Sequence, residues 1–122
     1  MNICSFKILN LYRRNLNIKN TMIAIPASEN NINALIDDRF GRCPFFCFYN
    51  EDTGKSEFRV NLIRSDAGGV GPKVAEFLAI SGVNKVYATE FGPKAKDVLD
   101  KLKIETQMAK KGKKVREIIE NL

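Results

Sequence analysis

The sequence predicts an α/β fold in which helices flank a mixed β-sheet. Between residues 22 and 63, short apolar segments of strand length are separated by polar turns. After residue 67 the pattern changes, and segments with a helical period of apolar residues alternate with further short apolar segments. Two glycine-containing turns mark the places where the first two helices begin. The expected element order is β-β-β-α-β-α-β-α, in a chain of 122 residues that suits one domain.

The first three predicted strands form an antiparallel meander. Residues 22–27 are a clean apolar strand, and residues 44–49 are a nearly continuous aromatic run that suits a strand buried on both faces. Residues 50–55 contain Gly54, which can adopt the positive φ of a hairpin turn. Residues 56–63 alternate apolar and polar side chains, so we expect them to return as the neighbouring antiparallel strand.

The remaining elements alternate helix and strand. Pro72 suits the first turn of a helix, Gly82 a helix stop, and Gly92-Pro93 the opening of a second helix. In chain order the expected elements are a helix over 72–81, a strand over 85–89, a helix over 93–102, a strand over 104–108 and a helix over 115–122. Helical crossovers bring parallel strands together, so the sheet should be mixed, as in the ribonuclease-H-like group of folds. In such sheets, ligands bind beyond the carboxyl ends of the parallel strands, where helix N-termini also point.

The charge distribution argues against a nucleic-acid partner. The net charge is +6, but residues 1–21 hold four bases and no acid, which leaves 16 bases against 14 acids in the rest of the chain. No apolar run is long enough for a membrane span. The chain has no histidine, so the usual acid–base group at neutral pH is missing. We therefore expect neither nucleic acid nor membrane as a partner, and no enzymatic activity.

Residues 1–21 are predicted to be an N-terminal extension, disordered or loosely helical, and residues 22–122 to be the domain. The extension is rich in asparagine and basic residues, and Met22 then begins a clean strand. Three cysteines, Cys4, Cys43 and Cys47, make an odd number without framework spacing, which favours reduced thiols and a cytoplasmic location.

A charged loop at residues 37–43 is the sharpest candidate for a binding site. Arg39 and Arg42 lie three residues apart, and their donor forks suit phosphate, carboxylate or sulfide-rich anions. Asp37 and Asp38 could orient the two guanidinium groups or cap the turn, while Phe40 is expected to pack inward. The alternative is a surface turn pinned by Asp–Arg pairs.

Two glycine turns could supply backbone donors to the same ligand. Gly68, Gly69 and Gly71 remove side chains just before a predicted helix N-terminus, where N–H groups and the helix dipole can meet an anion. Gly92-Pro93-Lys94 repeats this arrangement at the next helix. The alternative is that both are tight strand-to-helix turns and nothing more.

Cys43 is the one plausible metal ligand, because it stands where the charged loop meets its strand. Nearby positive charge would lower the pKa of this thiol and favour the thiolate that binds iron or copper. Cys47 lies about 13 Å further along an extended strand, so the two sulfur atoms cannot share one ion and Cys47 is expected in the core. A two-metal nuclease is excluded, because the predicted strands over 22–27, 44–49 and 85–89 carry no acid.

Four segments in this order resemble the dinitrogenase iron–molybdenum cofactor biosynthesis family, which includes NifX, NafY and the C-terminal part of NifB. They are the strand MIAIPA at 22–27, the loop DRFGRCPFF at 38–46, the glycine turn at 68–71 and GPKA at 92–95. The resemblance covers residues 22–122. The missing histidine, and Asp37-Asp38 where Asp-Pro is common, favour the small stand-alone branch of this family.

The resemblance implies a nitrogenase accessory factor-like domain that binds or carries a metal cluster. Its cargo would be an iron–sulfur cluster, the iron–molybdenum cofactor or a precursor, with cluster donor or acceptor proteins as partners and a monomer or weak homodimer as the form in solution. The residues placed at the site are Asp38, Arg39, Arg42, Cys43, Gly68, Gly69, Gly71, Gly92 and Lys94. The alternative function is a non-catalytic regulatory or scaffold module that binds a nucleotide or phosphate metabolite.

Overall fold

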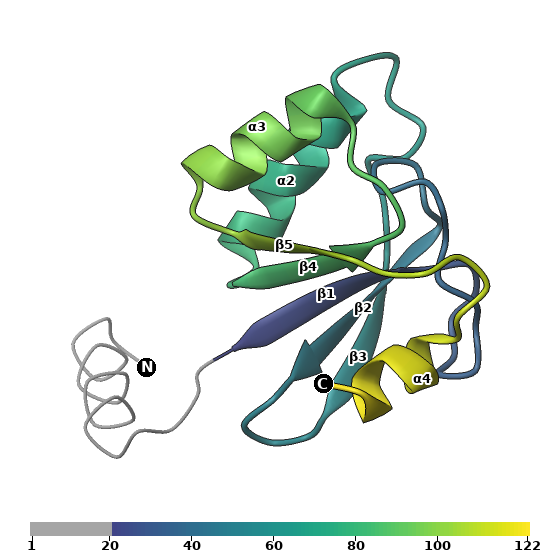
Figure 1. Cartoon of the computed structure of the whole chain (residues 1–122). Coiled ribbons are helices and arrows are strands. Elements are labelled where there is room, and N and C mark those ends of the chain that lie inside the picture. Colours follow the sequence, from purple (N-terminus) through teal and green to yellow (C-terminus); the bar gives the residue numbers. More distant parts are fainter. Residues whose placement is uncertain (1–20) are drawn as a thin grey trace, which may run out of the picture.

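A five-stranded mixed β-sheet forms the centre of the protein (Figure 1). The structure, a computed structural model, describes residues 21–122, so the predicted extension apart from Thr21 lies outside the described residues. The strands are β1 (Met22–Ala27), β2 (Phe45–Asn50), β3 (Ser56–Val60), β4 (Lys85–Ala88) and β5 (Glu105–Met108). Their spatial order is β3-β2-β1-β4-β5, with β1 antiparallel to β2 and parallel to β4. The predicted mixed α/β sheet is confirmed; its place in the ribonuclease-H-like group stays a prediction.

Within residues 21–122, three helices cover the two faces of this sheet. They are α2 (Val70–Ile80), α3 (Pro93–Lys101) and α4 (Val115–Glu120). α2 and α3 lie on one face and α4 on the other (Figure 1). Among residues 21–122, no helix is long and apolar enough to cross a membrane.

Each face of the sheet has its own core, because side chains along a strand alternate between the two faces. On the α2–α3 face, Phe46 and Phe48 of β2 belong to one cluster with Leu78 and Leu99. On the α4 face, the second cluster comprises Ile23, Ile25, Ala27, Ala34, Ile36, Cys47, Val115 and Ile118. The prediction that Cys47 is a core residue is confirmed, since its side chain is fully buried.

β3 is shorter than the sequence predicts. It ends at Val60 instead of residue 63, because Asn61 turns its side chain into the protein and is 1% exposed. The Asn61 Oδ1 atom accepts a hydrogen bond from the N–H of Ile63 at 3.2 Å, which closes a turn in place of further strand pairing. The alternation of apolar residues beyond Val60 therefore does not reflect a strand face, and Leu62 is 85% exposed.

Two glycines allow three segments to meet closely at one edge of the sheet. A Cβ atom at Gly71 would lie 3.0 Å from the Cβ atom of Ala95, so the N-termini of α2 and α3 pack directly against each other. A Cβ atom at Gly41 would lie 3.1 Å from the Cγ1 atom of Val70 and 3.2 Å from the backbone nitrogen of Gly71. The charged loop is thus held against the first turn of α2.

Replacing Gly71 should separate the two helix N-termini. We expect Gly71→Val to lower the free energy of unfolding by about 1–3 kcal/mol, because the new side chain overlaps α3. Gly68→Val is the matched control, since nothing lies within 4 Å of a Cβ atom at that position. Chemical denaturation of the two variants measures the difference, and equal destabilisation of both would contradict the close packing at Gly71.

Candidate functional site

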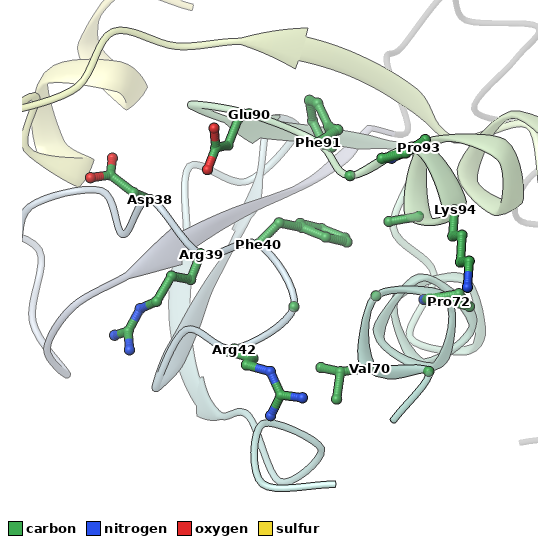
Figure 2. A pocket seen from close by; sticks show the side chains of 15 residues that line it. Asp38, Arg39, Phe40, Arg42, Val70, Pro72, Glu90, Phe91, Pro93 and Lys94 are labelled. Atoms are coloured by element: carbon green, nitrogen blue, oxygen red, sulfur yellow. The ribbon is translucent and has the colours of Figure 1, made fainter. Parts of the chain in front are cut away.

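A pocket of about 720 Å³ opens beyond the carboxyl ends of β1 and β4 (Figure 2). Three segments form it: the charged loop that follows β1, the start of α2, and the segment from β4 into α3. Its lining residues are Asp38, Arg39, Phe40, Gly41, Arg42, Gly69, Val70, Gly71, Pro72, Glu90, Phe91, Gly92, Pro93, Lys94 and Ala95. The pocket is therefore at the edge of the sheet where a ligand is expected in an open α/β fold.

The structure brings most of the predicted site residues together. The predicted residues that line the pocket are Asp38, Arg39, Arg42, Gly69, Gly71, Gly92 and Lys94. Two predicted residues do not line it, Gly68 and Cys43. Gly68 lies one residue too early in the turn, whereas Gly69, with φ 65°, is the N-cap that begins α2.

Both helices present unpaired backbone donors to the pocket. Gly69 and Gly92 are the N-caps of α2 and α3, and within the described chain neither helix has a capping side chain or an acid in its first turn. Residues 70, 71, 94 and 95 belong to the first turns of these helices. A backbone N–H group there has no carbonyl oxygen of its own helix to donate to. The positive ends of two helix dipoles also meet here. This arrangement favours an anion.

The two arginines are already engaged with the protein. Arg39 donates to Asp37 through Nε at 3.1 Å and Nη2 at 3.0 Å, and Asp37 is 8% exposed. Burial acts to raise the pKa of Asp37, but hydrogen bonds from Arg39 outweigh it and hold that pKa below its ordinary value. Arg42 donates through Nη1 to the carbonyl oxygen of Arg64 at 2.8 Å. The interpretation of a turn pinned by an Asp–Arg pair thus holds for Arg39.

Lys94 is the cation of the pocket that is left without a partner. Its side chain is exposed and makes no ion pair or hydrogen bond with any residue of the described chain. Lys73, which stands at the same place after the proline of α2, pairs with Asp66 at 3.1 Å. In Figure 2, Lys94 lies on the side of the pocket formed by the helix N-termini. Lys94 can therefore respond to a bound anion without breaking an existing pair.

The pocket is lined by charged side chains of both signs. Arg39, Arg42 and Lys94 against Asp38 and Glu90 give three positive and two negative side chains, a sum of +1. In Figure 2, Asp38 and Glu90 lie on the side away from Lys94.

Phe40 and Phe91 form an apolar floor of the pocket, with their ring centroids 5.6 Å apart. Phe40 is 5% exposed, so the prediction that it packs inward is confirmed. Glu90 and Phe91 also line the pocket and were not predicted from the sequence. Their position directly before Gly92-Pro93, the predicted opening of a helix at the site, could have indicated that they line it.

Cys43 does not face this pocket, which corrects the prediction. Its side chain is fully buried in the core of the α2–α3 face, and its Sγ atom lies 3.5 Å from the carbonyl oxygen of Phe40. Burial, and then the charge of Asp37, raise the pKa of this thiol to about 12, whereas the opposing effect of Arg39 is smaller. Within residues 21–122 no cluster of three or more histidine, cysteine or acidic side chains could hold a metal ion.

Asn61 holds the charged loop in place and was not predicted. Its Nδ2 atom donates to the carbonyl oxygens of Gly41 and Cys43, both at 2.9 Å. These bonds fix the backbone between Phe40 and β2, so they set the position of the loop against α2. An asparagine at the end of an alternating apolar segment was the one signal for this role.

The buried thiols should be unreactive in the folded protein. In a Cys4→Ser variant the two remaining thiols, Cys43 and Cys47, have pKa values raised by burial to about 12. We expect them to react with a disulfide reagent at pH 8 only after denaturation. The folded state resists their deprotonation, so the free energy of unfolding should fall as pH rises from about 9, the ordinary thiol value, towards 12. Rapid labelling of Cys43 in native protein would contradict its burial.

Removing the Asn61 amide should loosen the pocket loop. We expect Asn61→Leu to lower the free energy of unfolding by about 2 kcal/mol or more, because two loop carbonyls lose their donor. Amide hydrogen exchange in residues 38–43 should also become faster. Asn30→Leu, at an exposed position, is the control. Unchanged exchange in this loop would show that the Asn61 amide does not position it.

Comparison with known proteins identifies the family of this chain. A family model described as dinitrogenase iron-molybdenum cofactor matches residues 21–122. The uncharacterized protein MJ0580 of Methanocaldococcus jannaschii is 32% identical over 97 residues, 77% of this chain and 79% of that protein.

Two solved structures share the fold and part of the sequence. The apo form of the orange protein from Desulfovibrio gigas has a TM-score of 0.79 at 28% identity, covering 84% of this chain and 87% of that one. A putative NifB protein from Thermotoga has a TM-score of 0.71 at 30% identity, covering 82% and 84%. The chain belongs to the dinitrogenase iron–molybdenum cofactor family.

Proposed function

We propose that this protein is a non-enzymatic carrier that holds an anionic metal–sulfur cluster in the 720 Å³ pocket during cofactor biosynthesis or cluster handling. The cargo is of the iron–sulfur or iron–molybdenum type. The observation that carries the proposal is that two helix N-termini without capping side chains meet beside Lys94, which pairs with no residue among 21–122. These groups offer N–H donors and positive charge where a ligand can reach them.

The family and the structural relatives support this role. The matching family model takes its description from the dinitrogenase iron–molybdenum cofactor, and one structural neighbour is a putative NifB protein. Both descriptions name components of cofactor assembly and so support a role in cofactor biosynthesis or cluster handling. The proposal of a carrier, instead of an enzyme, follows from the pocket side chains, which supply charge and donors but no nucleophile beside a base among the residues described.

Binding of the cluster would be through its outer surface. Since the Cys43 thiol is buried in the core, the pocket residues can hold the sulfides of a cluster by N–H···S hydrogen bonds and by charge, without a bond to a metal. Ligands that travel with the cargo, or that a donor or acceptor protein supplies, would complete the metal coordination. Such outer-surface binding suits a protein that must release what it carries.

A second candidate ligand is a small organic anion such as a nucleotide or phosphate metabolite. The observation that favours it is that Phe40 and Phe91 lie next to the helix N-termini. The aromatic rings could contact the apolar part of such a molecule, and the helix N-termini could bind its phosphate. Cluster and organic phosphate use the same donors, so direct binding measurements must separate them.

Lys94 should control the affinity for an anionic sulfide. Under anaerobic conditions we expect the full chain to bind tetrathiomolybdate, followed by its visible absorption, and Lys94→Ala to bind it about threefold to tenfold more weakly. Lys101→Ala, at the other end of α3, is the matched control. Cys43→Ser should bind as the unaltered protein does, provided that it folds.

Two further results decide between the ligands. Protein purified without oxygen should contain metal and acid-labile sulfide, and inorganic phosphate should compete weakly with tetrathiomolybdate. Tight phosphate binding with no affinity for tetrathiomolybdate would favour the organic anion. Binding of tetrathiomolybdate that is abolished in folded Cys43→Ser would contradict outer-surface binding.

A further inference from the structure

The free edge of β3 supports a second inference, which does not depend on the pocket. We propose that two copies of this protein associate by antiparallel pairing of their β3 strands, so that the two sheets become continuous. The partner is thus a second copy of this chain, and the interface has one defined register. The hydrogen-bonding groups of this edge and the order of its charges favour that pairing.

Three residues of β3 turn their backbone groups away from the sheet. β3 is the last strand of the sheet, and β2 pairs with it on one side only. Asn50 donates to Lys55 and Asn61 donates to Pro44, both at 2.9 Å, so odd-numbered residues of this segment bond to β2. Because bonding alternates along an antiparallel strand, the N–H and C=O groups of Ser56, Phe58 and Val60 point outward. Within residues 21–122 no further strand pairs with them.

One register satisfies all of these groups at once. When Phe58 lies opposite Phe58 of the second copy, Ser56 lies opposite Val60, and the three outward-facing residues of each strand pair completely. The two-fold symmetry of this arrangement is that of a closed dimer. In the same register Glu57 of each copy lies opposite Arg59 of the other, which gives two pairs of opposite charge.

The same charges exclude the neighbouring registers. A slip of one residue misaligns donors and acceptors, and a slip of two residues places Glu57 opposite Glu57 or Arg59 opposite Arg59. A slip of four residues runs β3 against the 50–55 turn or the segment after Asn61. Charges on an edge strand usually prevent pairing with another strand. In β3 they oppose the neighbouring registers but favour the register with Phe58 opposite Phe58.

The side chains on both faces of the edge fit this pairing. Glu57 and Arg59 lie on the α2–α3 face, with 3.2 Å between the Oε1 atom of Glu57 and the Nε atom of Arg59. The Arg59 guanidinium lies above the ring of Phe48. Phe58 and Val60 lie on the other face, where Val60 is 54% exposed and would be covered by the second copy. Five paired residues make a small interface, so the dimer should be weak and reversible.

Charge reversal tests the register directly. Glu57→Lys and Arg59→Glu each place like charges opposite one another, so each variant alone should self-associate about tenfold more weakly or not at all. An equimolar mixture of the two variants restores both opposite-charge pairs and should form a heterodimer. Sedimentation equilibrium and native mass spectrometry measure these species. The double variant Glu57→Lys/Arg59→Glu should dimerise as the unaltered chain does.

Reversals of an exposed pair on α3 serve as controls. Asp97→Lys and Lys101→Glu change the net charge by the same amounts and should leave self-association unchanged. Thermal melting of every variant shows that it is folded. The proposal is overturned if the unaltered chain stays monomeric up to millimolar concentration, if both single variants still dimerise, or if their mixture forms no heterodimer.

Discussion

The close approach at Gly41 and Gly71 is the constraint on which the site depends. A Cβ atom at Gly41 or Gly71 would lie 3.1 Å or 3.0 Å from a neighbouring side chain, a contact so tight that the neighbouring segment would have to shift. Without those side chains, the charged loop, α2 and α3 can reach the same edge of the sheet. Close packing of this kind fixes relative positions more firmly than a flexible side-chain contact could.

The charged residues around this junction have different functions. Arg39 and Arg42 are held by Asp37 and by the carbonyl oxygen of Arg64, so they chiefly define the shape of the loop. Lys94 and the backbone N–H groups have no such engagement within the part of the chain that is described. The pocket thus separates the groups that build it from the groups that are free to meet a ligand.

Much of this organisation could be predicted from the sequence. The strands, the two helix openings and the presence of the charged loop follow from local patterns of apolar residues, glycine and proline, which act within a few positions of the chain. The convergence of the three loops was predictable because parallel strands share a ligand-binding edge.

The burial and the long-range contacts of individual side chains were harder to predict. Cys43 stands next to Arg42, and proximity in sequence favoured a thiolate near positive charge. In the structure the Cys43 side chain is buried in the core, and desolvation raises its pKa by more than the positive charge of Arg39 lowers it. Asn61 was missed for a similar reason, since its bonds to Gly41 and Cys43 join residues about 20 positions apart. The local sequence shows only an asparagine at the end of an alternating apolar segment, and it does not show which residues that asparagine contacts.

The inward orientation of Cys43 and Cys47 has a consequence for any sulfur-rich molecule that enters the pocket. Neither sulfur can reach it to exchange ligands or to form a mixed disulfide, because both are shielded from solvent. As far as these two thiols are concerned, such a molecule would leave the pocket by the opening of hydrogen bonds and ionic contacts, with no disulfide to reduce.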